Sequence, residues 1–227
     1  MAPLGTLHAV PFNPRVKKIL ATAALAGIEL TVPSEFKFGV TNKSSEFLVK
    51  FPLGKVPALE TATGFHLVES NAIAYYVAES APNPVRDQLL GVTPEERALV
   101  QQWIFFTQLH LDPTVGKLGA WRKGFAQYDA KEEETNGAEM KRWLDYMESS
   151  LKGKRWFLGD TNGPSLADIT IGGSMYFAYF TYVDGEMRKE YPELLRWYEQ
   201  LKAEPKLSTA YAGEMVLKRV EPGMAKE

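Results

Sequence analysis

A proline that directly follows a β-branched residue, at the expected start of a strand, places the strongest constraint on this chain. Val56-Pro57 lies in the stretch FPLGKVPALE at residues 51–60. Proline has no backbone N–H to donate to a neighbouring strand, and it suits a tight bend, for which a cis X-Pro bond is available. Such a bend leaves the backbone N–H and C=O of Val56 able to pair with an extended ligand instead of a neighbouring strand. The sequence therefore predicts a ligand-binding bend at this position.

A second marker follows about one strand-turn-strand later, in the stretch LVESNAI at residues 67–73. Glu69-Ser70 lies where a strand is expected to give way to a helix. The carboxylate, the hydroxyl and the first helical N–H groups should therefore meet at one spot, where the helix amino terminus attracts an anion. That spot fits a ligand carrying an ammonium and a carboxylate on one carbon. Together the two stretches predict a pocket for a small zwitterionic peptide.

Composition and charge exclude several classes of protein. The 227 residues carry a formal charge of -2, so no strong field recruits nucleic acid or an anionic membrane. Cysteine is absent, which excludes disulfides, zinc-thiolate sites and a thiol nucleophile on the protein, and the three histidines lack metal-ligand spacing. The longest apolar run, residues 169–183, is shorter than the roughly 20 residues that span a bilayer, and no secretory signal is recognisable. We expect a cytoplasmic protein with no metal and with neither nucleic-acid nor membrane partners.

The first 80 residues have the element order β-α-β-α-β-β-α, which is that of a thioredoxin-like unit. Short apolar or alternating runs predict strands at 6–10, 28–32, 56–61 and 65–68. Helices are predicted at 15–26 and 71–79, with a loop and a short helix within 33–50. The buried stripe of the first helix is assigned to Val16, Ile19, Leu20 and Ala23, and Gly27 is expected to end that helix.

Residues 81–91 are expected to form a linker, because Ala81-Pro82-Asn83-Pro84 interrupts any periodicity, and residues 92–227 to form an all-helical domain. Thr93-Pro94-Glu95-Glu96 is a strong helix start, and that helix should run to about His110 before Asp112-Pro113 stops it. Ser165 and Asp168 form a second capping box, which we interpret as structural. Further helices are predicted at 129–152, 165–183 and 193–203.

Three groups of residues, in this order and spacing, resemble the glutathione transferase superfamily. They are Gly54-Lys55-Val56-Pro57, then Glu69-Ser70 opening a helix, then Phe157-Leu158-Gly159-Asp160 with Ser165-Leu166-Ala167-Asp168. Residues 51–57 and 69–77 look most like the transferase-like domain of the elongation factor 1B gamma subunit and its stand-alone fungal relatives. The gamma subunit carries a further carboxy-terminal domain for which this chain has no room, which favours a free-standing transferase. The resemblance implies an α/β thioredoxin-like amino-terminal domain followed by an all-α carboxy-terminal domain.

The same resemblance implies that the peptide is glutathione and that the protein is a homodimer. The backbone of Val56, at the bend before Pro57, would pair with the cysteinyl part of glutathione. Glu69 and Ser70 would hold the γ-glutamyl end, and Lys55 would face the glycine carboxylate.

The group that ionises the thiol is harder to assign. Such transferases usually use a tyrosine, serine or cysteine near the end of the first strand, but here the first serine is Ser34 and the first tyrosine is Tyr75. Lowering a thiol pKa of about 8.5 by about 2 units requires roughly 2.7 kcal/mol, which one or two neutral donors and a helix amino terminus can supply. Asn13, just ahead of the first helix, is the first choice, although an asparagine before proline is also an ordinary turn residue. His8 is the second choice, although a histidine in an apolar strand is more often structural.

An acceptor site is expected between the domains, where ligand pockets concentrate. Aromatic residues proposed as its lining, whose helical spacing also fits a core, are Trp103, Phe106, His110 and Trp121. The leading hypothesis is transfer of glutathione to a small hydrophobic electrophile. Two alternatives stay open: glutathione-assisted cis/trans isomerisation of a conjugated small molecule, as in a fungal biosynthetic pathway, and a non-catalytic interaction module like that of the gamma subunit.

Overall fold

A four-stranded mixed sheet forms the centre of the first domain, in the order β2-β1-β3-β4. The computed structural model describes residues 2–10 and 13–223, and its strands are β1 (Gly5–His8), β2 (Leu30–Thr31), β3 (Ala58–Thr61) and β4 (His66–Val68). The pair β1–β2 is parallel and the other two pairs are antiparallel. Leu7 is paired with Leu59, and His8 with Ala58. Because side chains alternate along a strand, these two pairs lie on opposite faces of the sheet.

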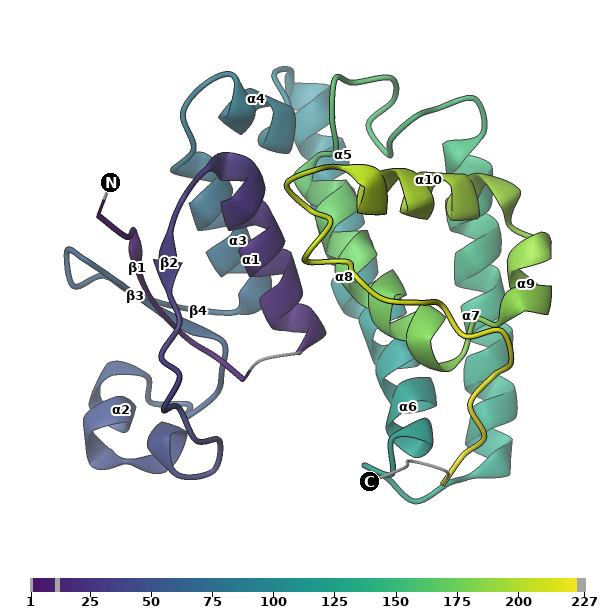
Figure 1. Cartoon of the computed structure of the whole chain (residues 1–227), viewed down its shortest axis with the longest axis horizontal. Coiled ribbons are helices and arrows are strands. Elements are labelled where there is room, and N and C mark those ends of the chain that lie inside the picture. The colour runs from purple at the N-terminus through teal and green to yellow at the C-terminus, as the bar shows by residue number, and fades with distance from the viewer. Residues whose placement is uncertain (1, 11–12, 224–227) are drawn as a thin grey trace.

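Helices cover the two faces of this sheet unequally. α1 (Pro14–Ala26) and α3 (Ser70–Glu79) pack over Leu7 and Leu59, in the larger core. A 3₁₀ turn (Thr41–Lys43) and α2 (Ser45–Lys50) lie on the other face, where Phe47 and Phe51 pack on Ala58. Figure 1 shows α1 and α3 between the sheet and the second domain, with α2 on the far side. The predicted thioredoxin-like order is confirmed, although β1 and β2 are shorter than expected.

The buried side of α1 differs from the predicted stripe. Leu20 is 37% exposed, so its assignment to the core is wrong, whereas Lys18 is only 1% exposed. The reason is a second helix packed on α1: a Cβ added at Gly173 of α8 would lie 3.7 Å from the Cβ of Lys18. The turn of α1 that holds Lys18 therefore faces the second domain, which a pattern read from one helix does not reveal.

Residues 81–91, predicted as a linker, contain α4 (Val85–Leu90). The helix that begins at the Thr93 capping box is α5 (Pro94–Phe106), and it leads through a π-helical turn (Thr107–Leu111) directly into α6 (Asp112–Arg122). The predicted stop at Asp112-Pro113 is therefore wrong. Pro113 is the second residue of α6, and the wider π-helical turn just before it lets the helix continue without an N–H at this position.

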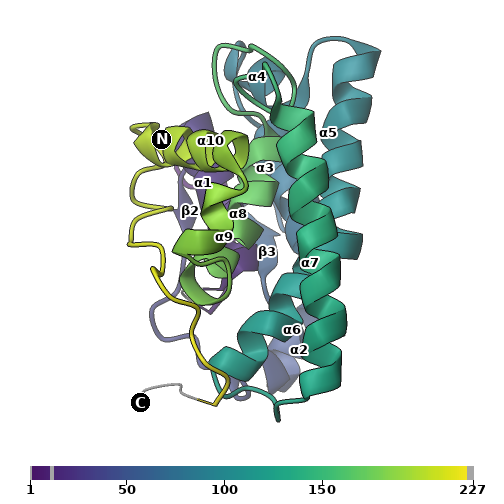
Figure 2. The same cartoon turned by 90° about the vertical axis from the view of Figure 1, so that its right-hand side faces the viewer.

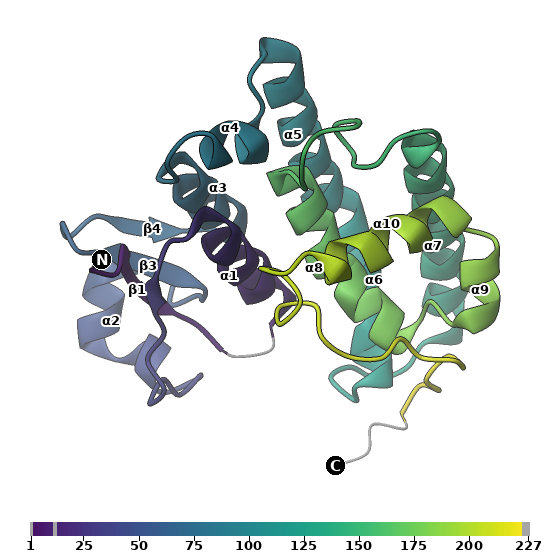
Figure 3. The ribbon, with the colours of Figure 1, turned by 45° about the horizontal axis from the view of Figure 1, so that its top comes forward.

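The second domain is built around α8 (Leu166–Thr181), whose residues are almost all buried. The Ser165–Asp168 capping box that opens α8 is confirmed, and the Asp168 carboxylate also accepts the indole N–H of Trp197 at 2.8 Å. The long α7 (Ala130–Leu151) runs beside α5 and α6 (Figure 2). The unpredicted α9 (Gly185–Lys189) leads to α10 (Pro192–Ala203), which crosses α7 and α8 (Figure 3).

In the part of the chain that the structure describes, no helix has both the length and the apolar character needed to cross a membrane.

Candidate active site between the two domains

A pocket of about 1340 Å³ opens between the two domains. The first domain contributes to its walls the segment between β1 and α1, the loop around the 3₁₀ turn, the loop before β3, and the junction of β4 with α3. The second domain contributes the π-helical turn, α6 and the start of α7. Six of the seven predicted site residues line this pocket, and five of them come from two of these segments: Lys55, Val56, Pro57, Glu69 and Ser70. A sixth, Asn13, lines it from the start of α1.

The bend before β3 has the expected form. The Val56-Pro57 peptide bond is cis, and β3 starts only at Ala58. The backbone N–H and C=O of Val56 bond to no backbone group of the described residues. The buried side chain of Asn42 supports the loop, because its Nδ2 donates to the carbonyl of Gly54 at 2.7 Å and its Oδ1 accepts from Gly39 N–H. The bend thus holds an unpaired backbone edge open to the pocket.

Glu69 adopts a conformation that L-residues rarely adopt, with φ 71° and ψ 114°. It is the one non-glycine residue with positive φ among those described. Such a residue stores of order 1–3 kcal/mol of strain and is characteristic of functional sites. The Glu69 side chain makes no capping bond to α3 and no ion pair with a described residue, so its carboxylate is available at the pocket wall. Ser70 is the first residue of α3, where the helix N–H groups point outward.

Two exposed lysines stand on the pocket wall formed by the α2 side of the first domain. Lys55 precedes the bend, and Lys43 ends the 3₁₀ turn. Neither ammonium lies within 4 Å of a carboxylate of the described residues. Sequence reasoning identified Lys55 but missed Lys43, which follows Asn42, the residue whose side chain joins this loop to Gly54.

Asn13 is the N-cap residue of α1, and its Oδ1 accepts the N–H of Arg15 at 2.9 Å. The amide NH₂ is then the end of the side chain that remains available at the pocket, next to the amino terminus of α1. An N-cap amide normally uses its oxygen in this way, and its NH₂ group can only donate.

His8 lies away from this pocket, on the α2 face of the sheet. Its ring packs against Phe47 and Phe51 at centroid distances of 5.5 and 5.7 Å. Its Nε2 is 3.8 Å from the carboxylate of Glu60, too far for a hydrogen bond. Burial lowers the pKa of His8, while the Glu60 carboxylate opposes that shift.

The second-domain wall of the pocket, where an acceptor site was proposed, is formed largely by α6, with Gly116, Ala120 and Trp121 among its lining residues. Of the four aromatic residues expected there, Trp121 is the one that lines this pocket. Phe106 and His110 line a separate groove, and Trp103 is buried against Phe157. The exposed Phe38 and Leu53 supply apolar surface from the first domain.

A polar network closes the pocket where the domains meet, and sequence reasoning missed it. Lys18 Nζ donates to Asn71 Oδ1 at 2.8 Å and lies 3.7 Å from Asp112 Oδ2. Asn71 Nδ2 donates to Gln108 Oε1 at 2.9 Å, and Ser174 donates to Asp112. Asn71, Gln108 and Asp112 all line the pocket. Within residues 2–10 and 13–223, no group of three or more His, Asp or Glu side chains has the arrangement of a metal site.

Comparison with known proteins identifies the family to which this architecture belongs. Residues 3–79 match the family model for the glutathione S-transferase N-terminal domain, and residues 132–200 match that for the C-terminal domain. A glutathione S-transferase-like protein from a Fusarium species is 40% identical over 198 residues, which are 87% of this chain and 88% of that protein. The chain belongs to the glutathione transferase family.

Two further relatives of this chain are elongation factor 1-gamma proteins. That of Xenopus laevis is 36% identical over 216 residues, which are 94% of this chain but 47% of the relative, so the chain spans about half of that protein. The transferase-like domain of elongation factor 1-gamma from Saccharomyces cerevisiae has a TM-score of 0.83 and 24% identity, with 98% of this chain and 100% of that one covered. This last likeness shows the fold. The predicted resemblance to both groups is confirmed.

Local sequence patterns do not identify the four residues that join the two domains. Lys18 directly follows another lysine, Lys17, so the sequence alone does not show which of the two is buried. Gln108 and Asp112 lie in and just after the π-helical turn, where the sequence pattern predicts the end of a helix. Asn71 follows the Glu69-Ser70 pair but carries no pattern of its own.

Proposed function

We propose that this protein is a glutathione-dependent transferase, which binds glutathione in the interdomain pocket and presents its thiolate to a small hydrophobic electrophile. The observation that carries the proposal is the convergence, in one pocket, of the open Val56 backbone, the Glu69-Ser70 pair and the exposed Lys55 ammonium. These three features come from two segments of chain, and each matches a different part of one peptide.

The charges of the pocket fit those of the tripeptide. Glutathione carries an ammonium and a carboxylate at its γ-glutamyl end and a second carboxylate on glycine. Glu69 faces the ammonium, and Ser70 with the amino terminus of α3 binds the neighbouring carboxylate. Lys55 and Lys43 hold the glycine carboxylate, and Val56 pairs with the cysteinyl backbone.

Asn13 is the donor that we assign to the thiolate, in preference to His8. Its amide NH₂ faces the pocket at the amino terminus of α1, whereas His8 lies on the other face of the sheet. A hydrogen bond to a charged group contributes about 1.5–3 kcal/mol, and the helix terminus adds about 0.3–1 kcal/mol. Together these cover the roughly 2.7 kcal/mol that a thiol pKa lowered by about 2 units requires.

Ultraviolet difference spectroscopy of bound glutathione tests the proposal, because the thiolate absorbs where the thiol does not. We expect the thiolate band at neutral pH, and S-methylglutathione, which has no ionisable thiol, should bind without producing it. Turnover is then measured with a panel of small hydrophobic electrophiles. A pocket that binds glutathione without a thiolate band would contradict the catalytic part of the proposal.

A second candidate function is a non-catalytic interaction module. The observation that favours it is the absence of cysteine from the chain and of serine and tyrosine from the first strand and the turn after it, together with the likeness to elongation factor 1-gamma. The same spectra separate the two candidates, because a module binds glutathione as the thiol or does not bind it. Glutathione-assisted isomerisation would use the same thiolate as transfer does, and conjugated alkenes in the panel test it.

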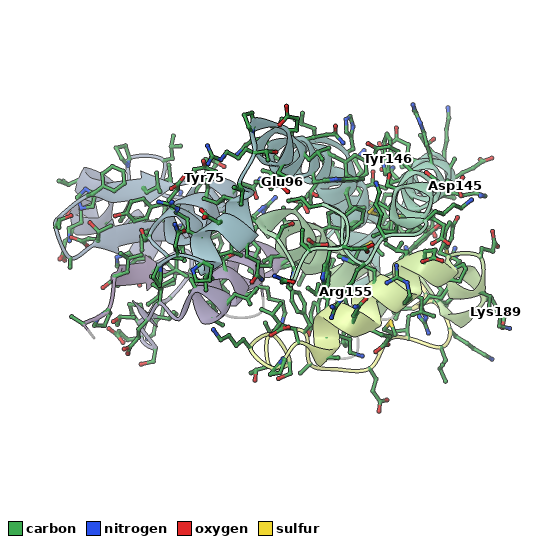
Figure 4. The ribbon with its side chains drawn as sticks, turned by 90° about the horizontal axis from the view of Figure 1, so that it is seen from above. Tyr75, Glu96, Asp145, Tyr146, Arg155 and Lys189 are labelled. Carbon is green, nitrogen blue, oxygen red and sulfur yellow. The ribbon has the colours of Figure 1, made fainter. Side chains whose placement is uncertain are left out.

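We further propose a cytoplasmic homodimer. Support for the dimer comes from a groove of about 500 Å³ on the outer side of the second domain, lined by residues of α5, the π-helical turn and α7. Phe105 and Leu109 at this groove are 55% and 63% exposed, which is unusual for large apolar side chains placed together. Figure 4 shows Tyr146, another lining residue, at the surface of the second domain.

A further inference from the structure

Lys18 is a lysine whose side chain is almost wholly buried, with 2% of it exposed. A buried ammonium needs compensating partners, because its removal from water is expensive. Burial lowers the pKa of the Lys18 ammonium, and the Asp112 carboxylate opposes this shift. Such a group on the side of α1 that faces α8 therefore calls for a reason beyond packing.

The two partners of Lys18 belong to different domains. Asn71 in α3 accepts from its Nζ at 2.8 Å, and Asp112 at the start of α6 lies 3.7 Å away. Asn71 is the residue directly after Ser70, so its side chain is fixed within the first turn of α3. A second bond, from Asn71 to Gln108 at 2.9 Å, crosses the same boundary.

The π-helical turn brings the second-domain partners to this point. It spans Thr107–Leu111, between α5 and α6, and its extra residue per turn changes the direction in which the following side chains point. Gln108 and Asp112 lie in and just after this turn, and both reach the pocket wall. Single π-helical turns of this kind are frequent at functional sites.

We infer that Lys18 is a positioning residue for the γ-glutamyl end of glutathione: it anchors Asn71, and with it the Glu69-Ser70 corner, to Asp112 of the second domain. This inference rests on the function proposed above. Lys18 lies behind the pocket wall and acts through Asn71. The strained backbone of Glu69 makes such an anchor necessary, because a strained residue persists only where its surroundings hold it in place.

A double-mutant cycle between Lys18 and Asn71 tests the inference, with the dissociation constant of glutathione measured by calorimetry. Lys18→Met keeps the length of the apolar stem and removes the charge, and we expect affinity to fall about tenfold. Asn71→Leu breaks the same bond and also the bond to Gln108, so it should cause at least the same loss in the wild-type background but a smaller further loss after Lys18→Met. Asn71→Asp keeps an oxygen acceptor for Lys18 and should bind within about threefold of wild type.

Lys17 provides a matched control on the same helix. Its Nζ donates to the carbonyl of Ala210 at 2.7 Å and lies 3.9 Å from the ring centre of Tyr176, so it also joins α1 to the second domain. It does not line the pocket or belong to the network. Lys17→Met should therefore leave glutathione affinity within twofold of wild type, even if the free energy of unfolding falls.

The outcomes separate this inference from the proposed function. Wild-type protein that binds no glutathione overturns both. If the wild type binds glutathione, three results overturn the inference alone. These are an unchanged affinity in Lys18→Met, additive losses of affinity in the cycle, and a loss of affinity in Lys17→Met equal to that in Lys18→Met. If Lys18→Met does not fold, the contrast between Asn71→Leu and Asn71→Asp decides, and equal affinity of these two variants overturns the inference.

Discussion

The side-chain oxygen of Asn13 accepts the backbone N–H of Arg15 at 2.9 Å, and this bond determines which end of the amide is available to the pocket. Asn13→Asp should keep the cap, because aspartate and asparagine are similarly good N-cap residues. It replaces the donor with a carboxylate, which can only repel a thiolate. We expect the pKa of bound glutathione to rise above that in the wild-type complex by at least about 1 unit, measured by spectroscopic pH titration of the thiolate band.

Asn13→Ser is the matched control, because serine retains both the cap and a donor. Its bound thiol should have a pKa between those of wild type and Asn13→Asp, and the melting temperatures of all three proteins should agree closely. An unchanged thiol pKa in Asn13→Asp would remove Asn13 from the mechanism.

Substitution of Glu69 by glycine should raise the free energy of unfolding but lower the affinity for glutathione. Glycine adopts a φ of 71° without the steric penalty of an L side chain, so Glu69→Gly should relieve local strain. We expect the free energy of unfolding to rise by about 1 kcal/mol, while glutathione affinity falls by at least about tenfold through loss of the carboxylate. Urea unfolding and calorimetry measure the two quantities.

Glu69→Gln separates the two effects in that experiment. It keeps the strained backbone with a side chain of the same length, so its stability should equal that of wild type. Its affinity should fall, because an amide lacks the charge that attracts the γ-glutamyl ammonium. Equal affinity of Glu69→Gln and wild type would show that the carboxylate does not bind the ammonium.

The sequence predicted those parts of the site that depend on local chain geometry. The bend at Val56-Pro57 and the strand-to-helix junction at Glu69-Ser70 are each encoded within a few residues, and both lie in the pocket. The Thr93 and Ser165 capping boxes are equally local, and both form. Fold and site could be predicted to this extent because proline chemistry and helix capping act over three or four residues.

The predictions that were wrong or incomplete concern residues whose positions depend on contacts between distant segments. Lys18 is buried because α8 packs on α1, and Gln108 reaches the pocket because a π-helical turn continues into α6 where Pro113 was expected to end a helix. Phe106 and Trp121 both belong to the set of aromatic residues at helical spacing that were proposed to line the acceptor site. Phe106 lines the outer groove, whereas Trp121 lines the pocket. Periodicity identifies an apolar side chain but not the neighbour that covers it.

His8 should make the first domain sensitive to mild acid. Burial among aromatic rings lowers its folded-state pKa, against the opposing effect of Glu60, so the unfolded chain takes up a proton more readily than the folded one. The stabilisation is therefore full above the ordinary histidine pKa of about 6.5 and is lost as the pH falls through the lower folded-state value. We expect the urea midpoint to drop between neutral and mildly acidic pH.

His8→Phe should flatten that pH dependence, because phenylalanine keeps the ring contacts with Phe47 and Phe51 and cannot be protonated. His66→Gln is the control: it removes the other histidine next to Glu60 and should retain the sensitivity. Equal slopes of stability against pH in His8→Phe and wild type would assign the acid sensitivity to other groups.

Leu109 should be the residue at which the proposed dimer is most easily broken. It is 63% exposed at the groove that Phe105, Trp143 and Tyr146 also line, and apolar surface of this kind marks a protein contact. Leu109→Glu places a charge that would be desolvated in a dimer, so we expect sedimentation velocity to show a shift from dimer to monomer. Val49→Glu, a similar change at an 84% exposed residue of α2, should leave the sedimentation coefficient unchanged. If both variants sediment as the wild type does, the groove is not the contact between subunits.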